Sequence, residues 1–302
     1  MHTAIRYGKA HVALYRTYAT PFSGLVAIPE SPFTGGDNTL FAAEVDVEVL
    51  GNNFLPAYTA GDNANVVATD TMKNFILQAA LDYPGATQEG LLHFLGQRFL
   101  ETWPHLEALR LRSRQVPFAA APIPGGHSGT LFSRSRNDYG YSQMELVRED
   151  GEARPVDHQC GRLGLQLIKV TGSSFTRFVR DEYTTLPEAV DRPLFIYLDL
   201  FWRYGDVGDA VGSDHTRYLA SEQVRDFVGV VFHDFVSLSI QHLVHEMGQR
   251  LLARFPQIAE VSFEAQNRLW DTAFVSPTDE RTRVYCDPRP PYGSIFLSLA
   301  RE

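Results

Sequence analysis

Lysine is scarce in this sequence, so each lysine is a candidate for chemistry that arginine cannot perform. Only Lys9, Lys73 and Lys169 occur, and the remaining 24 of the 27 basic residues are arginine. A lysine amine can lose its proton and act as a base, whereas a guanidinium stays charged. Lys9 follows Tyr7 and Gly8 ahead of a predicted strand. It is a candidate base, although a solvated surface charge is the simpler interpretation.

Residues 66–74 contain a second candidate feature, a helix start that follows directly on an apolar segment. The first backbone N–H groups of a helix have no partner inside it, and the helix dipole adds positive potential there. Such a helix start can hold an anion. Thr69 and Asp70 stand at this point, where either could also be an ordinary N-cap.

Two further segments are unusual for a scaffold. Residues 174–194 form a long, charged and aromatic connection between predicted strands. A connection of this length is either functional or disordered. Residues 266–270 follow another predicted strand and include the polar pair Gln266-Asn267, for which a plain turn is the alternative.

An internal repeat organises the elements that must position these residues. Residues 91–100 align with residues 243–252 at an offset of 152, and Pro104 then aligns with Pro256. Chance similarity of two amphipathic helices is the alternative, but the shared Gly-Gln-Arg and the following proline favour a duplication. The repeat divides the chain into two modules of nearly equal length, residues 1–150 and 151–302.

Hydrophobic periodicity predicts the same element order in both modules: two strands, two helices and further strands. The predicted strands are 12–17, 41–49, 106–116, 144–148, 164–170, 194–202 and 259–263. The predicted helices begin at Thr69 or Asp70, at Thr87, at Ser221 and at Ser239, and Pro124 and Gly125 mark a turn. This order predicts antiparallel sheets with paired helices on one face. Two open sheets would leave exposed edges, so we expect an oligomer that covers them.

The composition excludes several classes of protein. With 44% hydrophobic and 21% charged residues the chain is not mainly disordered, and its net charge of −9 disfavours a nucleic-acid groove. No stretch approaches the roughly 20 apolar residues of a membrane span, and no signal peptide is recognisable, so we expect a cytoplasmic protein. Two cysteines and the absence of Cys-x-x-Cys and His-Glu-x-x-His motifs predict no metal site.

The segments described above resemble the urate oxidase (uricase) family. The matching motifs are Tyr7-Gly8-Lys9, Val67-Ala68-Thr69-Asp70-Thr71-Met72-Lys73-Asn74, Phe175 with Arg180-Asp181-Glu182-Tyr183-Thr184-Thr185-Leu186, Asp191-Arg192, Ile240-Gln241 and Gln266-Asn267. They extend from residue 7 to residue 267, so the resemblance covers nearly the whole chain. The two longer motifs are specific, whereas Gln-Asn alone would carry little information.

The resemblance implies an α+β fold of two tandem tunnelling-fold (T-fold) modules, 1–150 and 151–302. It also implies a homotetramer in which the antiparallel sheets close into a barrel-like tunnel, with active sites at subunit interfaces. The implied reaction is cofactor-independent oxidation of urate by O2 and water to 5-hydroxyisourate and hydrogen peroxide. The division into two modules agrees with the repeat.

The resemblance assigns substrate-binding roles to five residues. Phe175 would stack on the flat urate ring, and Arg192 would present a planar pair of donors to one edge. Gln241 would bind the opposite edge, because its amide is both donor and acceptor. The backbone N–H groups of Asp70 and Ile240 would complete the clamp.

The resemblance also assigns the catalytic groups. Lys9, acting through the hydroxyl of Thr69, would be the general base, and both residues would come from a neighbouring subunit. Thr69 would contact substrate as well. Asn267 would hold O2, and later water, over the ring. The resulting urate dianion would pass an electron directly to O2, so neither metal nor flavin is expected.

One position departs from the family pattern, and two other functions remain open. Many members have Asn-Lys-His where this chain has Asn267-Arg268-Leu269, and Leu269 cannot relay a proton. Either the Lys9–Thr69 pair suffices, with or without a water, or another group replaces the histidine. The alternatives are a pterin- or purine-binding T-fold protein without urate oxidase activity, and a structural oligomer.

Overall fold

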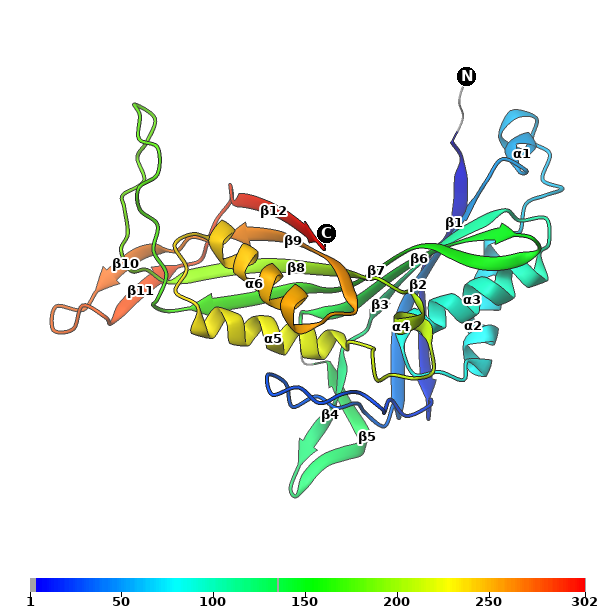
Figure 1. The fold of residues 1–302 in the computed structure, drawn as a ribbon, viewed down its shortest axis with the longest axis horizontal. Coiled ribbons are helices and arrows are strands. Elements are labelled where there is room, and N and C mark those ends of the chain that lie inside the picture. The colour runs from blue at the N-terminus through cyan, green and yellow to red at the C-terminus, as the bar shows by residue number, and fades with distance from the viewer. Residues whose placement is uncertain (1–3, 135, 302) are drawn as a thin grey trace.

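The computed structural model describes residues 4–134 and 136–301, and its elements follow the predicted repeat (Figure 1). The first half contains β1 (Arg6–Thr17), β2 (Leu40–Leu50), α1 (Leu55–Thr59), α2 (Thr69–Asp82), α3 (Gln88–Thr102), β3 (Ala108–Gln115), β4 (Phe118–Ile123), β5 (Gly126–Arg134) and β6 (Tyr139–Glu149). The second half contains β7 (Glu152–Lys169), β8 (Leu194–Tyr204), α4 (Gly208–Val211), α5 (Ser221–Asp234), α6 (Ile240–Arg254), β9 (Ile258–Asn267), β10 (Asp271–Val275), β11 (Arg283–Cys286) and β12 (Gly293–Ala300).

One continuous antiparallel sheet runs through both halves. Its eight strands lie in the order β1-β2-β3-β6-β7-β8-β9-β12. The expectation of two separate sheets was therefore wrong, because β6 and β7 form a hairpin that continues the sheet across the 150/151 boundary. The sheet is not closed in a single chain, and β1 and β12 are its two edges. The module boundary itself stays a prediction.

Each half has its own hydrophobic core, and both cores lie on the same face of this sheet. Leu111 of β3 lies opposite Met144 of β6, and Ser142, two residues away, faces the same side. Ser142 in turn lies opposite Cys160 of β7, which lies opposite Trp202 of β8. Since α3 packs on β3 and β6 while α5 and α6 pack on β7 and β9, all three helices cover this one face. The paired-helix prediction is confirmed.

The helix boundaries agree closely with the sequence patterns, except at one cap. Thr87 caps α3 by accepting the N–H of Gly90, and Ser239 caps α6 in the same way. Thr69 and Asp70 do not cap α2, because Ala68 occupies the N-cap position and both residues lie inside the first turn. Their backbone N–H groups are therefore free of intrahelical bonds.

The sequence patterns missed the short helices α1 and α4 and three features of the strands. The β4–β5 hairpin, which turns at the predicted Pro124 and Gly125, and the β10–β11 hairpin extend from the sheet, and β12 completes it (Figure 1). All five residues of β10 are exposed, so the strand lacks the apolar alternation that reveals half-buried strands. Within the described residues, no helix is both long and apolar enough to span a bilayer.

Candidate active site

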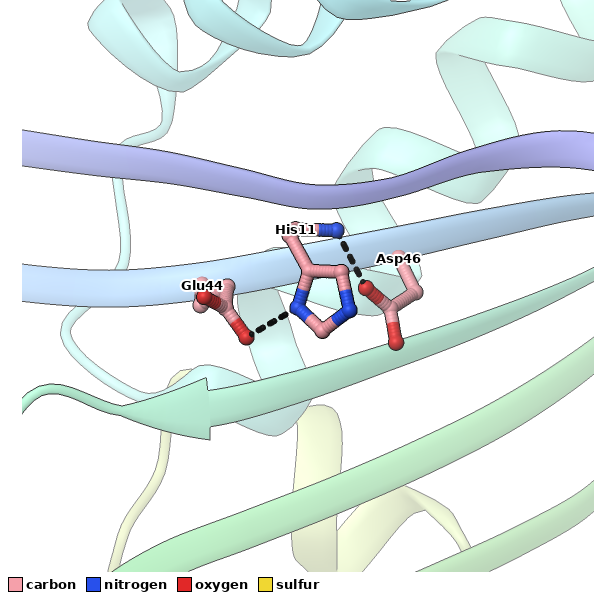
Figure 2. Close-up of side chains that lie close together, drawn as sticks. All are labelled: His11, Glu44 and Asp46. Atoms are coloured by element: carbon pink, nitrogen blue, oxygen red, sulfur yellow. Dashed lines mark hydrogen bonds and ion pairs between the residues drawn. The ribbon is translucent and has the colours of Figure 1, made fainter.

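A β-bulge in β1 positions Lys9. The register of β1 on β2 shifts between Lys9 and Val12, and the intervening His11 has a left-handed φ of 57°. The His11 N–H donates a 2.7 Å hydrogen bond to Asp46 of β2, and its Nδ1 lies 2.9 Å from Glu44 (Figure 2). A bulge of this kind bends the strand and redirects the neighbouring side chains. Lys9 immediately precedes it and is half-buried.

The same three side chains are close enough to hold a cation, but their other contacts argue for a structural role. His11, Glu44 and Asp46 place their ligand atoms within 4.8 Å of one another. Arg114 lies 3.0 Å from Asp46 and 3.5 Å from Glu44, so the carboxylates already face a positive charge. We interpret His11, Glu44 and Asp46 as side chains that stabilise the bulge, and we call them the latch below.

The segment that leads into Thr69 and Asp70 is tied to the start of β1, the strand that carries Lys9. The Val67 N–H donates to the Tyr7 hydroxyl at 2.9 Å and ties the segment before α2 to β1. The Asp70 carboxylate pairs with Lys73 at 2.6 Å. The hydrogen bond from Lys73 lowers the pKa of Asp70, and the charge of Lys9 adds to this effect. Lys73 holds the Asp70 carboxylate. The backbone N–H of Asp70 lies in the first turn of α2, where it has no partner inside the helix. Lys9, Thr69 and Asp70 are called the base group below.

Phe175 and Arg192 form the centre of a second group. The Arg192 guanidinium lies 5.4 Å from the centroid of the Phe175 ring. Phe175 forms an isolated antiparallel bridge with Ala189, and the Arg192 N–H donates to Ser173 at 2.8 Å. Asp191 accepts bonds from Thr171 and Gly172, and these contacts lower the pKa of its carboxyl group. The connection between β7 and β8 is thus ordered by its own hydrogen bonds.

The start of α6 joins this second group. Ser237, which lies just before the helix, donates from its hydroxyl to Ser173 at 3.0 Å and forms a parallel bridge with that residue. Ile240 and Gln241 are the first two residues of α6, with Ile240 buried and Gln241 exposed. The helix start therefore stands beside the segment that carries Phe175.

Asn267 ends β9 opposite Ile196 of β8. Its buried Oδ1 and the buried Nε of Arg192 have no hydrogen-bond partner among the described residues. Buried polar atoms are almost always paired in folded proteins, so this acceptor and this donor are each available to a polar partner. Phe175, Arg192, Ile240, Gln241 and Asn267 are called the clamp group below.

The two groups do not meet in one chain. Figure 1 shows α2 and the start of β1 at one end of the molecule, and the β7–β8 connection with β10 and β11 at the other end. A single chain therefore carries a base group and a clamp group, but no site that contains both.

The departure from the family motif lies at the clamp group. Leu269 is 44% exposed. The guanidinium of its neighbour Arg268 lies 4.0 Å from the Tyr197 ring centroid and 3.5 Å from that of Tyr292. Among the positioning residues, Asp46 and Ser237 were not found from sequence. Asp191 alone had a signal there, as a member of the Asp-Arg motif.

The comparisons with known proteins give the family. The Uricase family model matches residues 5–143 and 158–296. The uricase of Haloferax volcanii is 48% identical over 98% of both chains. The Bacillus subtilis uric acid degradation bifunctional protein PucL is 44% identical over the whole of this chain, which spans 62% of that longer protein.

Solved structures agree. A crystal structure of the urate oxidase of Bacillus sp. TB-90 superposes with a TM-score of 0.95 at 44% identity and covers 98% of this chain and 100% of that one. A uricase from Bacillus fastidious gives a TM-score of 0.95 at 42% identity, with 99% and 94% coverage. With a family model matched over most of its length and full-length relatives well above 40% identity, the chain belongs to the uricase family.

Proposed function

We propose that the chain oxidises urate with O2 and water to 5-hydroxyisourate and hydrogen peroxide, with the base group of one subunit completing the clamp group of another. As a member of the uricase family the chain is an oxidoreductase that acts on urate. The observation that carries the assignment of residues is the clamp group, which combines an aromatic face, a guanidinium and two buried polar atoms without partners.

The clamp group fits a flat, acidic heterocycle. Phe175 offers a ring face for stacking, and Arg192 offers parallel donors to a carbonyl and a neighbouring ring nitrogen. Gln241 provides a donor and an acceptor to the opposite edge, beside the backbone N–H of Ile240. The Asp70 N–H, at the positive end of α2, would come from the other subunit.

Proton removal is assigned to the base group. Lys9, when neutral, accepts the proton of bound urate through the Thr69 hydroxyl, which exchanges one proton for another. The urate dianion then gives two electrons to O2, which Asn267 holds over the ring, and the reduced oxygen takes up two protons, one of them from Lys9, to leave as hydrogen peroxide. Water adds to the oxidised ring to give 5-hydroxyisourate. Because Leu269 cannot extend this relay, we propose that the Lys9–Thr69 pair works with a water.

The open sheet supports an assembly of several chains. An exposed row of N–H and C=O groups at each edge invites pairing, and β1 and β12 are such edges here. We propose tandem T-fold modules, 1–150 and 151–302, in a homotetramer whose sheets close into a tunnel. The cytoplasmic location expected from the sequence remains part of this proposal. The pterin-binding alternative is not favoured by the relatives found.

Mixing two inactive variants tests the shared site. Lys9→Met removes the base, and Arg192→Gln removes the cation of the clamp, so we expect each variant alone to be at least about a hundredfold slower than wild type. Co-production of both should restore urate consumption with equal peroxide formation, measured with a chelator present, because some sites then combine two intact groups.

In the control each variant is produced alone, and size-exclusion chromatography verifies that every preparation assembles. If co-produced variants assemble but remain as inactive as the single variants, the two groups do not belong to one intersubunit site. If the wild-type protein does not consume urate, the assigned activity itself is wrong.

A further inference from the structure

A cavity of about 440 Å³ lies where the two halves of the chain meet. The β1–β2 connection, the start of α3, the end of β3, the β4–β5 hairpin and the start of α5 surround it. This volume is in the range of small-molecule pockets, about 300–1,000 Å³. The cavity contains no residue of the base group or the clamp group.

The repeat relates this cavity to the proposed active site. α2 and α5 begin at Thr69 and Ser221, and α3 and α6 begin at Gln88 and Ile240, so both helix pairs are offset by the same 152 residues. At the same offset, Gln115 ends β3 as Asn267 ends β9.

The strands and connections correspond as well. Lys9 and Arg162 each stand immediately before a register shift, in β1 and in β7. The two long connections contain one matching isolated bridge each, Phe22↔Gly36 and Phe175↔Ala189.

Counterparts of six of the eight proposed site residues line the cavity: Phe22 for Phe175, Gln88 for Ile240, Gln115 for Asn267, Arg162 for Lys9, Ser221 for Thr69 and Glu222 for Asp70. The counterpart of Gln241 is Glu89, which does not line the cavity, and no arginine corresponds to Arg192. In the cavity, however, the counterparts of both groups come from a single chain. The base-group counterparts belong to the second half and the clamp-group counterparts to the first half, as the proposed intersubunit site requires of two chains.

The two sites differ in the residue at the position of the base, which is Lys9 in the proposed active site and Arg162 in the cavity. Arg162 is fully buried, and its guanidinium donates to Asp138, Gln115 and Ser221. A guanidinium does not deprotonate in proteins, so it cannot accept a proton from a ligand. The aromatic ring, the amide, the hydroxyl and the helix starts remain, and they can bind without catalysing.

The charges of the cavity favour an anion. Its lining contains Arg136, Arg162 and Arg225 against Asp37 and Glu222. Arg162 is already paired with Asp138 and Glu222, so Arg136 and Arg225 are the cations left to face a ligand, and the starts of α3 and α5 add positive potential. Arg225 is directed to its neighbour Asp226 at 2.7 Å, and its planar donors can be shared with a ligand. We propose that this cavity is a second ligand site, which binds a planar anionic oxopurine of the urate class without oxidising it.

This inference rests on the proposed assignment of the active site, and urate binding in O2-free buffer tests it. Isothermal titration of the assembled wild-type protein should give two urate equivalents per chain. Gly129→Trp should remove one of them and leave kcat unchanged, because Gly129 lines the cavity and has open space around its Cβ position. Gly129→Ala is the matched control and should keep both equivalents.

Two more variants separate the sites. Arg225→Gln should weaken the second equivalent by roughly tenfold, since it removes a charge-assisted donor, while Arg154→Gln on the exposed surface should not. Arg192→Gln should abolish turnover and retain the cavity equivalent. An active wild-type protein that binds one urate per chain would overturn the second site alone, as would a second equivalent that survives Gly129→Trp. A protein with neither turnover nor binding would contradict both proposals.

Discussion

Lys9 and Arg162 occupy matched positions in the two halves, yet only Lys9 can release a proton. Lys9 stands at the edge strand β1, and Arg162 is buried in the middle of the sheet among Asp138, Gln115 and Ser221. A buried arginine with several partners is a fixed structural charge. The duplicated position has therefore taken two roles: a candidate base at the edge and a permanent cation at the junction.

Substitution of Lys9 by arginine should separate charge from proton transfer. Lys9→Arg keeps the positive charge but cannot become neutral, so kcat for urate should fall by about 10²–10⁴-fold while KM changes little. Steady-state kinetics measured alongside Lys73→Arg give the comparison, since Lys73 only pairs with the exposed Asp70 carboxylate. Equal kcat values in Lys9→Arg and wild type would exclude Lys9 as the base.

At the scale of the element, the bulge of β1 has a counterpart in β7 of the second half. The His11 N–H donates to Asp46 at 2.7 Å, and the N–H of Gly164 donates to Asp199 at 2.6 Å in the matching strand. Both donors have a left-handed backbone, with φ values of 57° and 75°. A non-glycine residue in this conformation is uncommon, so the bond to Asp46 compensates for the strain at His11.

Removal of the latch should destabilise β1 and disturb Lys9. Asp46→Ala leaves the His11 N–H without its acceptor and the Arg114 guanidinium with Glu44 alone, which should cost about 1–3 kcal/mol in the free energy of unfolding. Asp46→Asn keeps one acceptor oxygen and should lose less. Denaturant unfolding combined with kcat measures both effects, with Glu44→Gln as a control in which Asp46 is intact. An unchanged unfolding free energy in Asp46→Ala would contradict the role of the latch.

The elements that sequence predicted best are those with one buried face. The apolar stripe of α2, with Met72 and Ile76 fully buried, and that of α5 were evident from a period of 3.6. The β6–β7 pairing that merges the sheets was not, because periodicity reports which residues are buried and not which strands pair. The residues of the two groups, and their origin in different subunits, were implied by resemblance to a family, and the structure adds that the two groups lie at opposite ends of one chain.

At the scale of the whole molecule, the two halves are joined by more than a shared sheet. Glu89 of α3 is fully buried and accepts a 2.6 Å bond from the hydroxyl of Tyr218, which precedes α5. Arg162 adds bonds from the second half to Asp138 and Gln115 in the first half. The junction is therefore a buried polar seam, and its stability depends on the charges within it.

The seam should make the stability of the junction depend on pH. Burial raises the pKa of Glu89 most, and the nearby charge of Glu222 raises it further, against hydrogen bonds from Tyr218 and Cys160 that lower it. A carboxyl group whose folded pKa is raised stabilises the fold below its unfolded pKa, about 4.3, and loses that contribution as pH rises through the folded value.

Glu89→Gln removes the titrating group and retains an acceptor for Tyr218. The variant should therefore gain stability relative to wild type as pH rises from 4 to 9, by on the order of 1 kcal/mol for each unit by which the pKa is raised. Denaturant midpoints across this pH range measure the difference, and Glu101→Gln on the exposed side of α3 should show no such trend. A difference between Glu89→Gln and wild type that is constant with pH would mean that Glu89 does not titrate at the seam.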